Sequence, residues 1–106
     1  MHVDVTVKGD LPTMVKQRAS RKIGSLDRYV GTRALRARVV LAREHNPRLE
    51  RPVRATCEID LHGPIVRGHV DDVEVRHAID ALAEHMERQL RRFVDRRLDE
   101  QRRPKP

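Results

Sequence analysis

The chain has 106 residues, of which 37% are charged and 2% aromatic, with a net charge of +7 and an isoelectric point near 10.7. This length supports one domain with an aliphatic core. No stretch approaches the roughly 18 consecutive apolar residues of a membrane span. The single cysteine, Cys57, excludes an internal disulfide, which fits a cytoplasmic protein. So basic a domain favours nucleic acid or an anionic membrane as its partner, and the alternative is a solvated charged surface.

The N-terminal part predicts a strand and then a helix. Val3, Val5 and Val7 alternate with polar residues over residues 2–8, as in a half-buried strand. Apolar residues then recur at helical spacing, at Val15, Ala19, Ile23, Leu26 and Val30. We therefore expect one helix over residues 15–30, ending near Gly31, although Gly24 disfavours it locally by about 1 kcal/mol.

The middle of the chain predicts three strands. Apolar and polar residues alternate over residues 35–41, 53–61 and 66–70, with a polar loop over residues 44–52. The sequence His-Gly-Pro at residues 62–64 is a turn signal. Short connections of this kind predict antiparallel pairing from the second strand onward.

Residues 71–101 predict a long amphipathic helix, with Asp71 and Glu74 as a capping pair at its start. Its apolar seam consists of Val75, Ile79, Leu82, Met86, Leu90 and Phe93. A second face carries His85, Arg88, Arg92 and Arg96. Residues 1–101 are thus predicted to form the domain, and residues 102–106 a basic tail or the stub of a linker.

The element order β-α-β-β-β-α predicts an α+β fold, a two-layer sandwich with both helices on one face of a four-stranded sheet. The helices share this face because each has only one apolar stripe. The other face is expected to be solvated, lined by residues such as Arg36, Arg38, Arg54, Thr56 and Glu58.

Basic residues cluster on both predicted helices. They are Lys16, Arg18, Arg21, Lys22 and Arg28 on the first, and His85, Arg88, Arg91, Arg92 and Arg96 on the second. If the helices lie side by side, we expect one continuous cationic ridge able to bind phosphates. The alternative is ordinary solvation, with the pairs Glu84–Arg88 and Glu87–Arg91 compensating part of the charge.

The mode of nucleic-acid binding follows from the shortage of aromatic residues. Tyr29 and Phe93 both fall on or beside apolar stripes, so base stacking on aromatic rings is not expected. Recognition of the backbone and shape of a folded RNA fits better.

Metal binding and catalysis are not predicted. Cys57, His62 and His69 lack the spacing of zinc ligands, and His77 lies eight residues from His85. The paired acids at residues 71–72 are explained by capping, and the sequence has no glycine-rich phosphate loop or nucleophile–base motif. We therefore expect no enzyme activity, no cofactor and no metal.

Several segments together resemble the ribosome hibernation promoting factor / protein Y family, also described as sigma-54 modulation or ribosome-associated inhibitor proteins. The segments are HAIDAL at 77–82, ERQLRR at 87–92, VVLARE at 39–44 and the pattern K-I-x-x-L-D-R at 22–28. The resemblance covers roughly residues 2–98. Each segment is a weak motif, but their order and spacing are fairly specific.

This resemblance implies a fold similar to double-stranded RNA-binding domains. It also implies binding to the ribosomal RNA of the small ribosomal subunit, in the channel used by mRNA and the A- and P-site tRNAs. Translation would thereby be blocked under stress or in stationary phase. Matching the family's basic positions carries over Lys16, Lys22, Arg28, Arg43, Arg88 and Arg92, and His85 stands where a lysine is common.

The chain departs from the family at the start of its second helix, where Arg76 replaces a usual aromatic residue. The C-terminal dimerisation domain of long members is also absent from this sequence, which can be a short form or the N-terminal domain of a long one. Two other functions stay open: a general structured-RNA-binding domain, and a protein–protein adaptor using the exposed sheet face.

Overall fold

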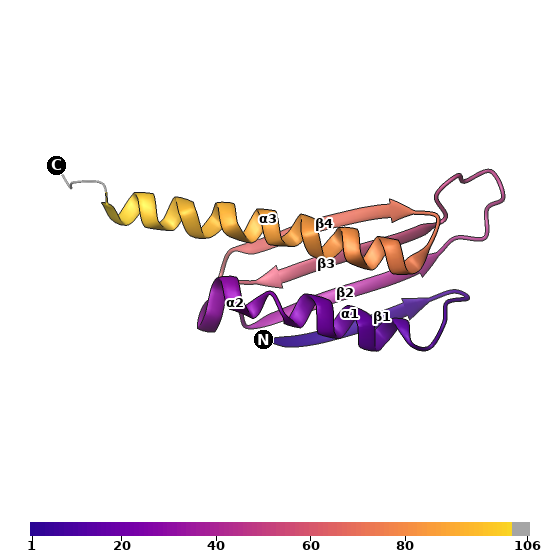
Figure 1. Cartoon of the computed structure of the whole chain (residues 1–106), viewed down its shortest axis with the longest axis horizontal. Coiled ribbons are helices and arrows are strands. Elements are labelled where there is room, and N and C mark those ends of the chain that lie inside the picture. Colours follow the sequence, from indigo (N-terminus) through magenta and orange to yellow (C-terminus); the bar gives the residue numbers. More distant parts are fainter. Residues whose placement is uncertain (103–106) are drawn as a thin grey trace.

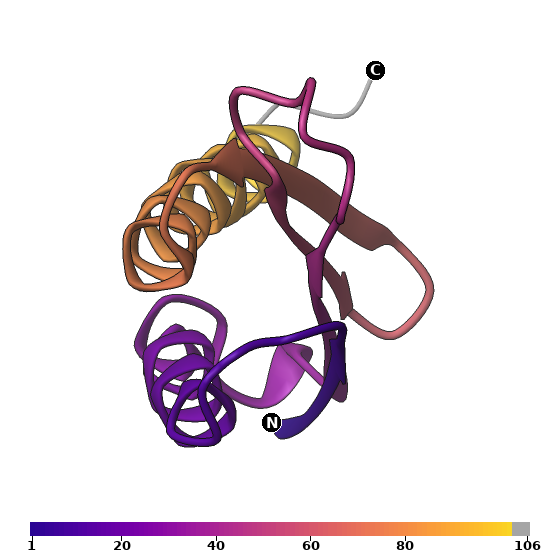
Figure 2. The same cartoon turned by 90° about the vertical axis from the view of Figure 1, so that its right-hand side faces the viewer.

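The computed structural model describes the backbone of residues 1–102 and the side chains of residues 1–97. In chain order the elements are β1 (His2–Lys8), α1 (Val15–Gly24), α2 (Asp27–Val30), the 3-10 turn η1 (Gly31–Arg33), β2 (Arg36–Arg43), β3 (Val53–Asp60), β4 (Ile65–Asp72) and α3 (Val75–Arg102). The helices cover one face of a four-stranded sheet and leave the other open (Figures 1 and 2). The predicted two-layer α+β sandwich is therefore confirmed.

The sheet has the strand order β1-β2-β3-β4. β1 is parallel to β2, whereas the β2–β3 and β3–β4 pairs are antiparallel, as the short connections predicted. The predicted turn after β3 is closed by Leu61, whose backbone N–H donates to the Pro64 carbonyl at 2.9 Å. Within it, His62 has a φ of 60°, in the left-handed region.

The core lies between the sheet and the helices and is aliphatic, as composition required. Alternate residues of the two central strands are buried: Ala37, Val39, Leu41, Val53, Ala55, Cys57 and Ile59. Cys57 is a small core residue, and burial raises the pKa of its thiol to about 12. Leu35 departs from its predicted place in a strand, because β2 begins one residue later and Leu35 is 48% exposed.

The predicted helix over residues 15–30 is wrong in one respect, because it is broken after Gly24. The Ser25 hydroxyl donates to the Lys22 carbonyl at 2.7 Å, and the Leu26 N–H donates to Ile23 rather than to Lys22. Glycine and serine both weaken a helix at this point, since serine competes for backbone groups. The break still leaves Leu26 and Val30 buried in the core.

The predicted capping pair of α3 is also wrong. Asp71 belongs to β4 and is bound by Arg54 across the strands at 2.8 Å. The adjacent Asp72 turns the chain instead, because its Oδ1 accepts the backbone N–H groups of Val73 at 2.7 Å and Glu74 at 3.2 Å. The helix then begins at Val75, four residues later than predicted.

Helix α3 is longer than the sheet it covers. Its 28 residues span about 42 Å, whereas eight-residue strands span about 26 Å. Its C-terminal part therefore runs past the strands, as Figure 1 shows. The tail predicted at residues 102–106 lies outside the described side chains and, from residue 103, outside the described backbone.

Candidate nucleic-acid interface

The two helical segments lie side by side on the sheet (Figures 1 and 2). Residues of α1, α2 and α3 line a groove of about 270 Å³ between them. Asp80 of α3 lines this groove. Arg18 donates to both carboxylate oxygens of Asp80, at 2.8 and 3.0 Å, and Lys22 Nζ lies 3.7 Å away. The hydrogen bond and charge of Arg18, supported by Lys22, hold the pKa of Asp80 below its usual range.

Farther along the same groove, Tyr29 joins α2 to α3. Its hydroxyl donates to Glu87, and the guanidinium carbons of Arg28 and Arg91 each lie 4.9 Å from its ring centroid. Arg91 also lies 3.4 Å from Glu87, which confirms one of the two predicted pairs. The Tyr29 hydrogen bond, followed by the charges of Arg91, Arg28 and Arg88, lowers the pKa of Glu87.

These contacts divide the predicted continuous ridge. Asp80, Glu84 and Glu87 line the groove between the helices and hold some of the cations that were expected to be free. Sequence spacing predicted that the helices carry cations, but could not show that carboxylates of α3 face α1 and α2. The surface therefore consists of two cationic strips on either side of a charge-paired groove.

Most of the predicted RNA-binding residues lie on these strips. Lys16 of α1, Arg28 of α2 and Arg88, Arg91, Arg92 and Arg96 of α3 are exposed, whereas Lys22 is half-buried beside Asp80. Glu84 does not pair with Arg88 within 4.0 Å, so that predicted pair is wrong and Arg88 keeps its charge available to a ligand.

Two predicted residues lie elsewhere. His85 packs on the far side of α3 against β4, where Gly68 lacks the Cβ that would lie 2.5 Å from the His85 ring. Arg43 ends β2, and its Nε donates to the Asp10 carbonyl at 2.9 Å, which holds the loop before α1. Both residues have packing roles in this structure, and their contact with RNA stays a prediction.

Sequence reasoning missed two features on this side. Tyr29 was expected only beside an apolar stripe, yet its hydroxyl connects α2 to α3 by a hydrogen bond to Glu87, and its ring contacts Arg28. Arg76, noticed only as a departure from the family pattern, lies in the first turn of α3 and lines one pocket with Arg18 and Arg21 of α1. Its replacement of an aromatic residue was the one signal available in the sequence.

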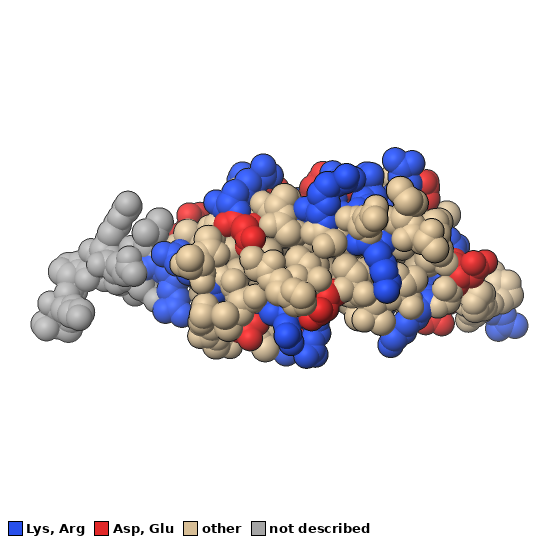
Figure 3. All heavy atoms as spheres, turned by 90° about the horizontal axis from the view of Figure 1, so that it is seen from below, with Lys and Arg blue, Asp and Glu red and all other residues tan. Residues whose placement is uncertain are grey.

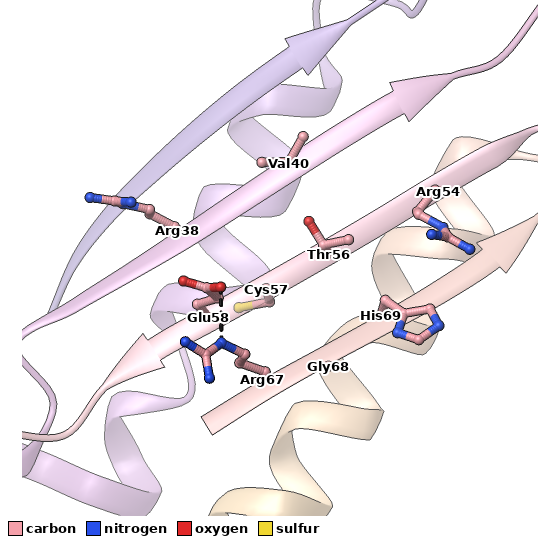
Figure 4. Close-up of a pocket in the computed structure, with 9 residues that line it drawn as sticks. All are labelled: Arg38, Val40, Arg54, Thr56, Cys57, Glu58, Arg67, Gly68 and His69. Atoms are coloured by element: carbon pink, nitrogen blue, oxygen red, sulfur yellow. Dashed lines mark hydrogen bonds and ion pairs between the residues drawn. The ribbon is translucent and has the colours of Figure 1, made fainter. Parts of the chain in front are cut away.

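The open face of the sheet also carries arginines, and three of its four described arginines are paired, with Arg38 as the exception. A hollow of about 490 Å³ lies on this face. Figure 4 shows the residues that line it, with Val40 and Thr56 between the charged side chains. Across the strands, Arg67 pairs with Glu58 at 3.1 Å, and the dashed line in Figure 4 marks this contact. The pairs Arg54–Asp71, at 2.8 Å, and Arg36–Asp4, at 3.5 Å, complete a cross-strand network.

Cations thus occur on both sides of the molecule. Seen from the edge formed by α1 and β1, Lys and Arg side chains lie along both long borders, with mostly uncharged residues between them (Figure 3). Their number alone therefore does not identify a binding surface. The pairing of each cation with neighbouring carboxylates is more informative.

The described residues bring together no group of three or more potential metal-ligating His, Cys, Asp or Glu side chains. Within the same part of the chain, no helix is both long and apolar enough to cross a membrane.

Comparison with known proteins gives a consistent result. Residues 3–98 match the family model described as sigma 54 modulation protein / S30EA ribosomal protein. The N-terminal domain of Thermus thermophilus Protein Y superposes with a TM-score of 0.71 at 27% identity, over 88% of this chain and 99% of that one. A ribosomal subunit interface protein from Coxiella burnetii gives a TM-score of 0.72 at 14% identity, over 90% of this chain and 99% of that one.

No curated protein matches the sequence at a significant level. The family match nevertheless covers nearly the whole described domain, and the fold and element order agree with the solved structures. The chain belongs to the sigma-54 modulation / S30EA ribosomal protein family of ribosome-associated proteins.

Proposed function

We propose that this domain is a ribosome hibernation factor that binds the small ribosomal subunit in the channel used by mRNA and tRNA. While bound there, it would block translation in idle ribosomes under stress or in stationary phase. Membership in a ribosome-associated family supports a ribosomal partner and a cytosolic location. The binding surface is inferred from the residues, whereas the channel site and the block of translation are what the resemblance to the family implies.

The observation that carries the proposal is the set of unpaired cations on the helix side. Among the described side chains, no carboxylate lies within 4.0 Å of the charged groups of Lys16, Arg21, Arg76, Arg88 and Arg92. Such cations can exchange their counterions for RNA phosphates without breaking an internal ion pair. Since they project from helices packed on a sheet, they form a rigid surface suited to a folded RNA.

The mechanism that follows is occupancy. Lys16 and Arg21 on one strip, with Arg88, Arg92 and Arg96 on the other, would contact phosphates on either side of the groove. Lys22 and Arg91 would contribute mainly through long-range electrostatic attraction, because Asp80 and Glu87 hold their side chains in place. No bond is made or broken, so the inhibitor would leave the ribosome unchanged.

Ribosome co-sedimentation tests this proposal. We expect the protein to sediment with small subunits, and contact with about five phosphates gives a log–log salt slope near −4. Affinity should then fall about 250-fold between 50 and 200 mM salt. Equal binding to unrelated folded RNAs would favour the general RNA binder, and protein remaining free at low salt would favour the adaptor.

The stoichiometry of inhibition tests the absence of turnover. In cell-free translation, half inhibition should need protein comparable in concentration to ribosomes, and washing should restore activity with the ribosomal RNA uncut. Inhibition by far less protein, or damage that persists after washing, would show catalysis and contradict the occupancy mechanism.

A further inference from the structure

A small pocket lies at the end of the molecule where α1 and α3 begin, the end that faces the viewer in Figure 2. It has a volume of about 330 Å³ and an apolar wall made by Pro12, Met14 and Val15. The polar lining consists of Gln17, Arg18, Arg21 and Arg76, with no carboxylate. The pocket therefore combines an apolar wall with three positive charges.

The three arginines are not equivalent. Arg18 is held by its two hydrogen bonds to Asp80, whereas Arg21 and Arg76 are exposed and have no described carboxylate within 4.0 Å. They project from two different helices onto one pocket. Two free guanidinium groups facing a shared space suit a phosphate group.

The apolar wall needs its own explanation. Met14 is 70% exposed, so its side chain is accessible to a ligand in the pocket. It also stands at the N-cap of α1 without a side-chain hydrogen bond to the first turn, where the helix dipole favours an anion. A methionine thioether is polarisable and packs well against flat rings.

We propose that this pocket holds one unpaired nucleotide of RNA, with its base against Met14 and Pro12 and its phosphate between Arg21 and Arg76. The volume lies near the lower limit of the roughly 300–1,000 Å³ range of ligand pockets, so it fits one nucleotide rather than a strand. Arginine planes can also stack on bases, which replaces the exposed aromatic residues this chain lacks. This inference rests on the proposed function, since it names one contact of the RNA-binding surface.

Nuclear magnetic resonance titration of the ¹⁵N-labelled protein tests the pocket without the ribosome. We expect adenosine monophosphate at about 10 mM to shift the backbone amides of Met14, Gln17, Arg21 and Arg76. Adenosine alone and inorganic phosphate alone should each bind at least about fivefold more weakly, because each uses only part of the pocket. Phosphate equal to the nucleotide, or no shift at these amides, would overturn the proposal.

Arg76→Gln is the variant to compare with wild type, with Arg38→Gln as its matched control. Both positions are exposed, and each substitution removes one charge; Arg38 lies on the open sheet face and lines a different hollow. We expect Arg76→Gln to weaken nucleotide binding about 5- to 10-fold and Arg38→Gln to leave it unchanged. An equal effect of both substitutions would show general charge attraction and contradict a specific pocket.

The same variants separate this inference from the function on which it rests. If wild-type protein fails to bind small subunits but the nucleotide still shifts the pocket amides, the function is wrong and the pocket stands. If small subunits bind wild type and Arg76→Gln equally, while the nucleotide does not shift the pocket amides, the proposed function stands and the pocket inference is wrong.

Discussion

The helix side and the open sheet side of this molecule both carry arginines but differ in how these are paired. On the sheet side, Arg36, Arg54 and Arg67 each lie within 4.0 Å of a carboxylate on a neighbouring strand. On the outer helix strips, Arg88 and Arg92 have no such partner among the described side chains.

The difference follows from the geometry of the elements. Antiparallel pairing places Arg54 opposite Asp71 and Glu58 opposite Arg67, so each charge meets its partner directly. On α3, the carboxylates Asp80 and Glu87 face α1 and α2, which leaves the outer cations uncompensated. A basic composition thus produces a binding surface only where the local fold separates the two signs of charge.

Charge reversal on each side of the molecule is expected to show the largest difference between the two faces. We expect Arg88→Glu with Arg92→Glu to weaken binding to small subunits by about 100-fold or more, because two phosphate contacts become repulsions. Both side chains are exposed, so the free energy of unfolding should change by less than about 0.5 kcal/mol per site. Co-sedimentation measures the affinity, and chemical unfolding the stability.

The matched control reverses Lys8 and Arg38, two exposed residues of the sheet side, to Glu. It changes the net charge by the same amount and should weaken binding less than about fivefold. Equal losses in the two double variants would show that net charge alone matters, and the division into two faces would be wrong.

The position of α3 depends on Gly68, which makes a second test of the comparison. A Cβ at Gly68 would lie 2.5 Å from Cδ2 of His85 and 2.8 Å from the buried Met86 sulfur. We therefore expect Gly68→Ala to lower the free energy of unfolding by about 1–3 kcal/mol through overpacking. Denaturant unfolding measures this loss.

Gly24 provides the control for that test. A Cβ there meets only a Val3 methyl carbon, at 3.9 Å, and the residue lies in the last turn of α1. Gly24→Ala should therefore raise stability by up to about 1 kcal/mol. If the two substitutions have the same sign, the close approach of α3 to β4 is not the reason for glycine at position 68.

A smaller effect is expected at the contact between α2 and α3. Tyr29→Phe keeps the ring between Arg28 and Arg91 but removes the hydroxyl that donates to Glu87. We expect a loss of about 1 kcal/mol in the free energy of unfolding, and a rise of the Glu87 pKa toward its usual value. Thermal unfolding and carboxyl titration by nuclear magnetic resonance measure these two quantities.

Tyr29→Leu removes the ring as well, and the cation–π contacts with it. It should therefore destabilise the domain more than Tyr29→Phe does. A Glu87 pKa that does not change in Tyr29→Phe would contradict the role given to the hydroxyl.

The fold could be predicted largely from sequence because its elements differ in hydrophobic period. Alternation identified the strands, and the spacing from Val75 to Phe93 identified α3 and its buried seam. The break after Gly24 escaped prediction because Leu26 and Val30 continue the apolar spacing across it. The start of α3 was misplaced because two adjacent aspartates offered two capping solutions, and only the pairing of Arg54 with Asp71 decides between them.

The candidate site was harder to predict than the fold. The exposure of Lys16, Arg88 and Arg92 follows from their distance from the apolar stripes. The partner of Arg18 and Lys22 could not be predicted in this way. Asp80 lies about sixty residues away in sequence and contacts them only when the helices pack. Local spacing finds which residues share a face, but contacts between faces need the tertiary structure.

The smallest expected effect is a loss of stability in acid. Two ion-paired carboxylates, one from each side of the molecule, can be compared for their share in it. The hydrogen bond and charge of Arg54 lower the pKa of Asp71 on the sheet, and Arg18 does the same for Asp80 between the helices. A carboxyl group whose folded pKa is depressed stabilises the fold above its unfolded pKa, near 3.9, and loses that contribution as pH falls through the folded pKa. The free energy of unfolding should therefore decrease as pH drops below about 4.

Asp71→Asn and Asp80→Asn should each reduce the decrease in the free energy of unfolding at low pH. Urea unfolding between about pH 2 and pH 6 measures this. Both carboxylates are more than a third exposed, so solvent screening should hold each contribution below about 1 kcal/mol. Asp80 should contribute the larger share, because two cations reach it and Arg18 is only 24% exposed, whereas Arg54 is 56% exposed. If Asp71→Asn reduces this decrease more, the sheet-side pairs hold the fold more tightly than the groove does. The groove would then be a weak point between two cationic strips, and the rigid RNA-binding surface inferred for the helix side would lose its support.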